Sequence, residues 1–427
     1  MTISYAEALE ILQSVGGHMA PSFQLDHETL RIEQAIGRTM KDKLICQAST
    51  PAFDTSAMDG FAVNSDSTTN ASESNPVILV VKGTMAAGDA PFSLSVDRDE
   101  DNLLPCVEIM TGAQFPYSFS KKSFDACIPI EHTKSVTGPR TDRRYVQVRK
   151  PVLEFQHRRR SGGDFQKGCT ILSAGSLVQS RHVMALASVG VERISVLRRI
   201  RIGIWSTGAE LLTGQKHEDC RNRTIDVNGP YLTAALQSLG ADASFLGIIM
   251  DDYDKLASTI EPYTTSPAFD ILITTGAVSA GKFDHVRQAI ESIGAQIHFH
   301  KVSIRPGHPV LFATFPAILE QDQPFQGGVN AGSRSARKTA FFGLPGNPVA
   351  TATCLRTILV PYLRRLASQP PENHIFARVV ANGDGRTNGN GNSLTIGDIC
   401  SRQPPHLDAF RHGRLHMRGN CFEVVIS

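Results

Sequence analysis

The sequence lacks any run of about 18 uninterrupted apolar residues, the length that a membrane-spanning helix requires. It also lacks an apolar signal core at its start. The segment from Met1 to Val15 mixes Glu7 and Glu10 with aliphatic residues at helical spacing. We therefore expect an amphipathic helix there, no secretory leader, no membrane span and a cytoplasmic location.

Paired cysteines are missing as well. The eight cysteines are scattered, with no C-x-x-C pair and no histidine at the spacing of a metal ligand. A structural zinc site is therefore not expected, and the thiols are predicted to be reduced, as in an intracellular protein.

A charge imbalance is also absent, because 43 basic residues nearly match 41 acidic ones and leave a formal net charge of +2. This balance argues against general nucleic-acid binding. The chain of 427 residues is 41% hydrophobic and 20% charged, as in globular proteins. Its length is too great for one core and suggests roughly three domains, at about 150 residues each.

From Arg199 to Arg364 the sequence alternates between strand and helix patterns. Helices are predicted after Asn228, from about Phe283 to Ile293 and from Val349 to about Leu366, and strands over 200–204, 245–250, 269–273 and 341–344. This alternation predicts a doubly wound parallel sheet with helices on both faces. Polar clusters follow the strands at 206–210, 251–252, 275–284 and 345–347. They should lie along one edge, where such sheets bind ligands.

The remaining segments have different compositions. From Cys46 to about Tyr145, short apolar runs are broken by Gly, Pro and Ser, which predicts a separate, mostly β domain. The segment from Phe376 to Ser427 suggests a small β module, with a closing strand at 422–426. Two polar stretches, 97–102 and 320–337, have loop composition and are predicted to be mobile insertions.

The stretch from Pro51 to Val63 places Asp54 and Asp59 on a loop that cannot bury them. Pro51 and Gly60 interrupt regular structure, and the residues after Asp59 have the pattern of a half-buried strand. On this pattern alone, an ordinary polar turn and an active-site loop both stay open.

The motifs of this loop and of later segments, in this order, resemble the molybdopterin molybdenumtransferase family, which includes bacterial enzymes and the E domain of gephyrin. The resemblance covers nearly the whole chain and weakens only in the C-terminal tail. It rests on Pro51–Val63, Ile109–Ala113, Arg159–Asp164 with Gly168 and Gly175, Ser206–Glu210, Asp226–Asn228, Gly247–Asp252, Gly276–Asp284, Arg305–Pro309 and Gly343–Val349.

The resemblance implies a multidomain α/β and β protein. Its expected parts are an extended linking domain (1–45 with 146–197), a mostly β domain (46–145), a molybdopterin-binding α/β domain (198–368) and a C-terminal β module (369–427). The implied activity is the insertion of molybdate into the dithiolene of adenylated molybdopterin, with release of AMP in a metal-dependent step.

The residue chemistry agrees with an anionic, phosphate-bearing ligand. Gly-rich turns at 276–281 and 345–347 should leave backbone N–H groups free, and the second opens a helix. Taken alone, Lys301 and Arg305 favour a solvated basic face, but beside a phosphate-binding turn they become candidate anion ligands. A cluster of the dispersed carboxylates would hold Mg²⁺, which prefers oxygen ligands and bridges to substrate phosphates.

The resemblance assigns the site residue by residue. The expected catalytic and metal-binding residues are Asp59, Glu210, Asp251 and Asp284. The expected substrate-binding residues are Thr111, Asp164, Ser206, Gly208, Asp226, Asn228, Gly276, Ser279, Gly281, Lys301, Arg305, Pro345, Gly346, Asn347 and Pro348.

The chain departs from the family pattern at a few positions. The family usually has acids where this chain has Ala209 and Lys282, glycine where it has Ala277, and lysine where it has His308. Two lost negative charges should weaken cation binding if those side chains point inward. An alternative is therefore a catalytically weakened molybdopterin-binding or scaffold paralogue. The long N-terminal region disfavours a third function, that of a single-domain adenylyltransferase.

By resemblance we also expect a homodimer. An adenylyltransferase partner would supply the substrate, and molybdoenzymes would accept the product. No nucleic-acid partner is expected.

Overall fold

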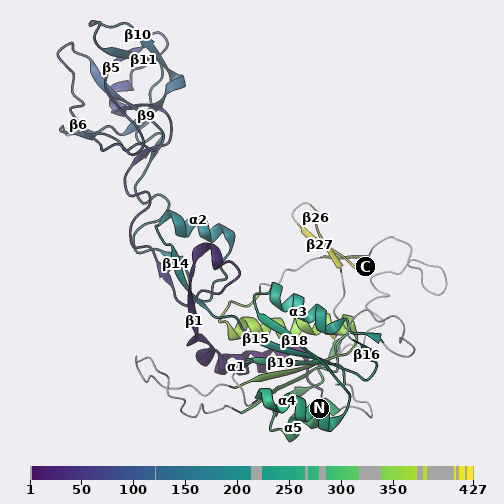
Figure 1. Ribbon diagram of the computed structural model, residues 1–427. Helices are drawn as coiled ribbons and strands as arrows, with labels where there is room; N and C mark the ends of the chain where they lie inside the picture. Colours follow the sequence, from purple (N-terminus) through teal and green to yellow (C-terminus); the bar gives the residue numbers. More distant parts are fainter. Residues whose placement is uncertain are drawn as a thin grey trace, which may run out of the picture. The chain divides into compact units, whose positions relative to one another are not determined.

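The computed structural model describes residues 2–120, 122–212, 224–264, 268–277, 285–316 and 338–372, together with the backbone of four short strands between 378 and 426. These residues form two compact units (Figure 1). The first comprises residues 1–42, 174–180 and 193–427, and the second comprises residues 43–173 and 181–192. The finer division into four domains stays a prediction.

The first unit is built on a six-stranded sheet with the order β18-β15-β19-β23-β22-β20. The four neighbours β18, β15, β19 and β23 run parallel, as the alternating sequence pattern predicts. One strand, β22, departs from the predicted parallel arrangement, because it runs antiparallel to both of its neighbours, β23 and β20. The strands are β15 (Arg201–Thr207), β18 (Asp242–Ile249), β19 (Ile271–Thr275), β20 (Gln296–His300), β22 (Leu311–Thr314) and β23 (Ala340–Leu344).

Alternate residues of each strand enter two different cores, because successive side chains of a strand point to opposite faces. Ile204 and Ile273 pack on one face with α1, α3 and α7. Trp205 and Leu272 pack on the other face with α4 and α5. The helices are α1 (Tyr5–Gln24), α3 (Asn228–Ser238), α4 (Tyr253–Thr264), α5 (His285–Ser292), α6 (Pro348–Cys354) and α7 (Val360–Leu366).

The chain changes direction at β15. It leaves β15 through α3 to reach β18 on one side, and it returns through α4 to β19 on the other side. The loops that follow β15 and β19 therefore separate, and in open α/β sheets this is the point where ligands bind. The fold thus singles out the segments after Thr207 and Thr275.

Two helical predictions are confirmed and refined. The first helix is longer than the Met1–Val15 segment suggested, and Ser4 and Glu7 form a capping box at its start. The predicted helix from Val349 to about Leu366 is helical throughout, but a π-helical stretch at Leu355–Leu359 separates α6 from α7.

Smaller elements complete the first unit. The strands β1 (His27–Arg31) and β14 (Arg193–Leu197) pair antiparallel. The C-terminal segment forms a three-stranded sheet, as the sequence predicted, from β24 (Arg378–Ala381), β26 (Gly413–Arg418) and β27 (Cys421–Ile426). Two-residue pairs join β16 (Leu211–Leu212) to β17 (Thr224–Ile225) and β21 (Ile304–Arg305) to β25 (Asp408–Ala409).

The second unit is mostly β, as expected, and its main sheet has the order β10-β11-β5-β7-β4-β9. The strand β4, which follows Asp59, is buried on both faces and is not the half-buried strand that was predicted. The sheet strands are β4 (Gly60–Val63), β5 (Val77–Met85), β7 (Leu104–Ile109), β9 (Ala126–Pro129), β10 (Thr133–Val136) and β11 (Arg144–Val148). The short pairs are β2 (Leu44–Ile45) with β13 (Thr170–Leu172), β3 (Thr55–Ser56) with β12 (Arg158–Arg159), and β6 (Ser93–Leu94) with β8 (Tyr117–Ser118), and α2 spans Ser180–Ser188.

The segment 97–102 is a loop, as predicted, but it is not an untethered insertion. Its Asp99 forms ion pairs with Lys82 at 2.7 Å and with Arg143 at 3.0 Å, and Asp99 is nearly buried. The loop is thereby tied to Lys82 of β5 and to Arg143, which directly precedes β11. The other predicted insertion, 320–337, lies outside the described residues.

Within the described ranges, no helix combines the length and apolarity needed to cross a bilayer. The five cysteines whose side chains are described are all free thiols.

Candidate functional site

Three backbone turns meet at the carboxyl ends of the parallel strands. A Cβ atom at Gly276 would lie 2.5 Å from the carbonyl oxygen of Thr207, and one at Gly346 would lie 3.3 Å from the Cα of Gly276. Gly276 also has a φ of +96°, a conformation that favours glycine. The close approach of the turns after β15, β19 and β23 therefore requires glycine at 276 and leaves little room for a side chain at 346. The structure thus brings these three predicted segments together at one edge.

Asp226 and Asn228 lie beside these turns, at the start of α3, and both are buried. The carboxylate of Asp226 accepts a hydrogen bond from the Ser206 hydroxyl at 2.7 Å and from the backbone N–H groups of Asn228 and Gly229 at 3.0 and 3.2 Å. It thereby satisfies N–H groups that the helix leaves free. Asp226, predicted to bind substrate, has structural partners for both of its oxygens.

The Asn228 side chain links α3 to the turn after β23. Its Nδ2 donates to the carbonyl oxygen of Gly346 at 2.8 Å. This bond fixes the orientation of the amide, and the Oδ1 atom is then buried without a partner among the described residues. A buried acceptor without a donor is costly. The amide oxygen is therefore available to a donor group of a ligand.

Asp251 follows β18 and interacts with the Glu210 carboxylate, which follows β15. Burial raises the pKa of Asp251, and the negative charge of Glu210 raises it further. A hydrogen bond from Thr207 and the nearby His285 oppose this shift. The Oδ1 atom of Asp251 is buried and has no hydrogen-bond partner among the described residues. Two like charges and an unsatisfied oxygen would both be stabilised by a cation.

Glu210 itself is exposed, and its carboxylate folds back over the preceding backbone. Its Oε2 would lie 2.7 Å from a Cβ placed at Gly208. Gly208 therefore gives the carboxylate the space it occupies. Ala209 is exposed as well.

The turn after β23 differs from its prediction in one respect. Backbone N–H groups were expected to be free at the start of the following helix, but Asn347 caps that helix. Its Oδ1 accepts from the N–H groups of Val349 and Ala350 at 3.0 and 3.2 Å. Pro348 occupies the first helical position and has no N–H. The helix start is therefore satisfied internally, and Pro345 before it is buried.

Lys301 and Arg305 lie on the segment after β20. Lys301 is half-buried with a φ of +78°, and its backbone N–H donates to the Val310 carbonyl at 2.9 Å. Arg305 is exposed in β21. The Nδ1 atom of His308, which replaces a usual lysine, lies 2.8 Å from the Val302 carbonyl oxygen. This imidazole is therefore engaged with the backbone of its own turn.

In the second unit, Asp59 and Thr111 form a close pair. The Oδ1 atom of Asp59 accepts from the Thr111 N–H at 2.7 Å and from its hydroxyl at 2.8 Å. These two bonds, the backbone one foremost, lower the pKa of the exposed Asp59 carboxyl. Asp59 precedes a strand and faces solvent, as the sequence predicted.

The other acid of this loop, Asp54, is used structurally. It accepts from the Ser161 N–H at 2.7 Å and from Nε of Arg158 at 2.6 Å. Burial alone would raise the pKa of Asp54, but these two donors outweigh it and the pKa is lowered. Asp164, predicted to bind substrate, pairs with Arg159. Asp54 thus ties the loop at 51–63 to the segment that carries Asp164.

Four of the predicted or discussed positions, Ser279, Gly281, Lys282 and Asp284, lie outside the described residues. Conversely, two residues that act on Asp251 were not expected from the sequence: Thr207, which contacts it, and His285, which interacts with it electrostatically. The position of Thr207 at the carboxyl end of a strand is the signal that could have found it.

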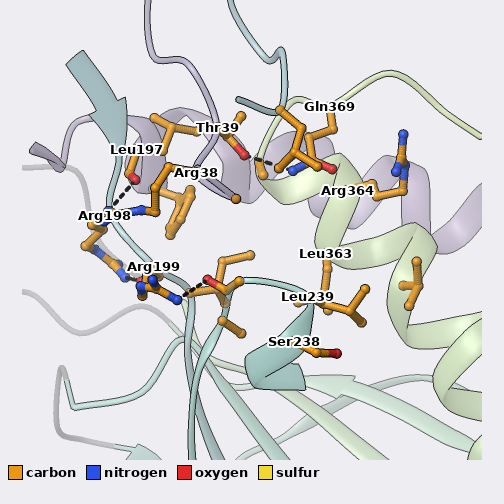
Figure 2. Close-up of a pocket in the computed structure, with 18 of the residues that line it drawn as sticks. Arg38, Thr39, Leu197, Arg198, Arg199, Ser238, Leu239, Leu363, Arg364 and Gln369 are labelled. Atoms are coloured by element: carbon orange, nitrogen blue, oxygen red, sulfur yellow. Dashed lines mark hydrogen bonds between the residues drawn. The ribbon is translucent and has the colours of Figure 1, made fainter. Parts of the chain in front are cut away.

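A cavity of about 190 Å³ lies elsewhere in the first unit, near the start of β15 (Figure 2). The C-terminal ends of α1 and α3 line it together with α7, and none of the predicted site residues that the structure describes does. Its Arg38 pairs with Glu28 and donates to the Leu197 carbonyl, and Arg199 donates to the Gly240 carbonyl. Its arginines thus serve carboxylates and backbone carbonyls, and the cavity is not the candidate site.

Among the described residues, no three His, Cys, Asp or Glu side chains form a metal-binding group. Two carboxylates, Glu210 and Asp251, nevertheless fit Mg²⁺, which is commonly held by one or two carboxylates together with substrate phosphates and water. The unsatisfied Oδ1 of Asp251 is the observation that supports this fit.

Two models of known protein families match the chain. Residues 3–190 match the model of the MoeA N-terminal region (domain I and II), and residues 203–365 match that of a probable molybdopterin binding domain. A molybdopterin molybdenumtransferase of Synechococcus elongatus is 30% identical over 85% of this chain and 80% of its own length. One of Bacillus subtilis is 29% identical over 85% of this chain and 76% of its own.

A solved structure gives the same result. The molybdopterin biosynthesis MoeA protein from Pyrococcus horikosii is 26% identical, with a TM-score of 0.63 over 86% of this chain and 81% of its own.

Proposed function

The chain belongs to the molybdopterin molybdenumtransferase family, and we propose that it inserts molybdate into adenylated molybdopterin and releases AMP. The observation that carries this proposal is the pair of Glu210 and Asp251, which follow the neighbouring strands β15 and β18. It combines a buried, unsatisfied carboxylate oxygen with a raised pKa of Asp251, caused first by burial and then by Glu210.

Two steps make up the proposed reaction. Water attacks the phosphoanhydride of the adenylated substrate, one P–O bond breaks, and AMP leaves. The two dithiolene sulfurs then replace two oxygens of molybdate. These oxygens leave as two water molecules, with two protons from the thiols and two from solvent, and molybdenum keeps its oxidation state.

The residues of the chain bind and orient the substrate in this proposal. Asn228 offers its free Oδ1 to a donor of the ligand, while its Nδ2 holds the turn at Gly346 in place. The glycines at 276 and 346 let the backbone approach the ligand closely. Glu210 and Asp251 would hold Mg²⁺, with Asp284 as a further expected ligand. The ion would supply charge neutralisation to the phosphates of the substrate.

Asp59 and Thr111, which lie on the second unit, are proposed to take part in the reaction, as the resemblance implies. The pKa of Asp59 is lowered by its bonds from Thr111, so this carboxylate stays charged over the whole physiological range. Asp164, Lys301 and Arg305 remain proposed substrate ligands. The homodimer, the adenylyltransferase partner, the molybdoenzyme acceptors and the cytoplasmic location are likewise proposals.

The direct test uses purified full-length protein with adenylated molybdopterin, molybdate and MgCl₂. We expect D59N and D251N to keep the fold, shown by circular dichroism, and to lose AMP release and molybdenum insertion. D254N removes a neighbouring exposed carboxylate on α4 and is the control, expected to act like the native protein. Normal insertion by D59N or D251N would contradict the proposal.

A second candidate is a pterin-binding or scaffold paralogue with little turnover. It is favoured by Ala209 and Lys282, because the chain has lost two acids that the family usually carries. Mg²⁺-dependent release of AMP separates the two functions, since clear turnover excludes the scaffold. Complementation of cells that lack their own insertase would give the same distinction in vivo.

A further inference from the structure

Residues 153–158 of the second unit form two successive tight turns. The Gln156 N–H donates to the Leu153 carbonyl at 3.0 Å, and the Arg158 N–H donates to the Phe155 carbonyl at 3.3 Å. The third residue of each turn has a positive φ, +61° at Phe155 and +55° at His157. Turns of this kind favour glycine or asparagine at the third position. Two bulky side chains occupy these positions instead.

Backbone bonds to neighbouring elements hold these turns in place. The Ala57 N–H donates to the His157 carbonyl at 2.9 Å, and the Cys127 N–H donates to the Gln156 carbonyl at 3.0 Å. The turns are therefore fixed against the loop that carries Asp59 and against β9. A left-handed conformation costs a non-glycine residue about 1–2 kcal/mol. Strain of this size persists where the surrounding structure imposes it, and it is concentrated at functional sites.

Burial does not compensate the strain at Phe155, because this residue is 39% exposed. Its ring instead supports a guanidinium group. The Cζ atom of Arg160 lies 4.1 Å from the ring centroid, a close cation–π contact. The turn thus presents an aromatic ring at the surface, with Arg160 stacked on it.

Three consecutive arginines begin at the last residue of the second turn, and two of them have carboxylate partners. Arg158 pairs with Asp54 and Arg159 pairs with Asp164. Arg160 has no hydrogen bond or ion pair from its guanidinium among the residues that the structure describes, although Asp54 is near enough to interact through its charge. The cluster therefore carries one cation in excess, and the donors of Arg160 are unused.

We propose that Arg160, oriented by Phe155, is a binding site for a tetrahedral oxyanion on the second unit. A guanidinium stacked on an aromatic ring is pre-oriented, and its fork of N–H groups matches two oxygens of a phosphate-like anion. The proposal explains together why a strained, exposed phenylalanine is kept and why one arginine of three is unpaired.

Two sources share this chemistry: the phosphate of a nucleotide and a free oxyanion such as molybdate. Binding to the full-length protein is measured by isothermal titration calorimetry at constant ionic strength with AMP, sodium molybdate, inorganic phosphate and adenosine. Binding of AMP alone identifies a nucleotide phosphate. Similar binding of molybdate and inorganic phosphate identifies a free oxyanion. Any binding of adenosine, which carries no phosphate, should be the same with and without Arg160.

Two substitutions test the site itself. R160Q should weaken oxyanion binding about tenfold, the typical effect of losing hydrogen bonds from a charged donor. F155G should weaken it about threefold, because it removes an exposed cation–π contact. F155G should also leave the thermal midpoint unchanged or raise it, since glycine relieves the positive φ. If Phe155 served only to pack against its neighbours, F155G would lower the thermal midpoint and leave oxyanion binding unchanged. This result would overturn the proposal.

R149Q is the matched control, because Arg149 is an exposed arginine of the same unit whose partner is Glu73. If R149Q and R160Q lost oxyanion binding equally, the loss would reflect only the general charge of the protein, and this result would also overturn the proposal. The measurement uses no adenylated substrate and no turnover. A failure of insertase activity and a failure of Arg160-dependent oxyanion binding are therefore separate results.

Discussion

The Asp59 carboxylate accepts both the backbone N–H and the hydroxyl of Thr111, at 2.7 and 2.8 Å, through a single oxygen. Among the described residues, its other oxygen accepts no hydrogen bond. Although the two residues are 52 positions apart in sequence, they form one unit in which Thr111 sets both the orientation and the charge of Asp59.

Removal of the Thr111 hydroxyl should therefore impair Asp59 without unfolding the protein. We expect T111A to lower the rate of molybdenum insertion about tenfold, since one hydrogen bond to a charged group is lost. T111S keeps the hydroxyl and should retain most of the activity. Equal activity of T111A and the native protein would show that the hydroxyl does not position Asp59.

The same substitution should change the titration of Asp59. Its pKa is lowered in the folded protein, so its contribution to stability is present above the ordinary value of 3.8 and is lost as the pH falls through the folded value. In T111A this loss should begin at a higher pH. A ¹³C-detected NMR titration of the aspartate carboxyls would measure the pKa directly.

Asp251 should respond in the opposite sense. Its folded pKa is raised, so the folded state holds the proton more tightly, and stability falls as the pH rises from the ordinary value through the folded one. At neutral pH and without metal, D251N should therefore melt at a higher temperature than the native protein. Differential scanning fluorimetry in the presence of a chelator measures this.

With Mg²⁺ present, the native protein should melt at a higher temperature than D251N. At ten times its dissociation constant, MgCl₂ should stabilise the native protein by about 1.4 kcal/mol and leave D251N unchanged. D254N should behave like the native protein. Equal stabilisation of D251N would place the ion elsewhere.

Gly276 and Gly294 have nearly the same φ but different surroundings. Alanine substitutions at the two positions therefore distinguish the cost of backbone strain from the cost of steric contact. Gly276 has a φ of +96° and faces the Thr207 carbonyl. Gly294 has a φ of +91°, and a Cβ atom there would have no described atom within 4 Å. G294A should cost about 1–2 kcal/mol from strain alone. G276A should cost at least about 1 kcal/mol more, because the turns must move apart. Urea unfolding of both variants measures the difference.

Asp226 is expected to be a structural residue before it is a ligand. D226A leaves the Ser206 hydroxyl and two helix N–H groups without a buried acceptor, and we expect a loss of about 2–4 kcal/mol in the free energy of unfolding. D226N keeps an amide oxygen for the N–H groups, and the Ser206 hydroxyl can rotate to accept from its nitrogen. It should cost about 1 kcal/mol, and a cost equal to that of D226A would contradict this assignment.

The sequence by itself determined the α/β character of the first unit and the edge at which its polar segments lie. These follow from local physics, because alternating strand and helix patterns produce parallel strands, and parallel strands end on the same side. The exposure of Asp59 was likewise predictable, because the loop that carries it lies directly before a strand. The family followed from the order of short motifs.

Only the tertiary structure decided what each polar group does. Asp54 and Asp59 share one loop, yet Asp54 is neutralised by Arg158 and Asp59 is bonded by Thr111, partners that are 104 and 52 positions away. Asn347 looked like part of an anion-binding turn and proved to cap a helix. Among the described residues, Asp251 has a free oxygen and Arg160 an unpaired guanidinium. Neither could be read from the sequence, because contacts between distant segments decide whether a group is satisfied, and no local pattern records those contacts.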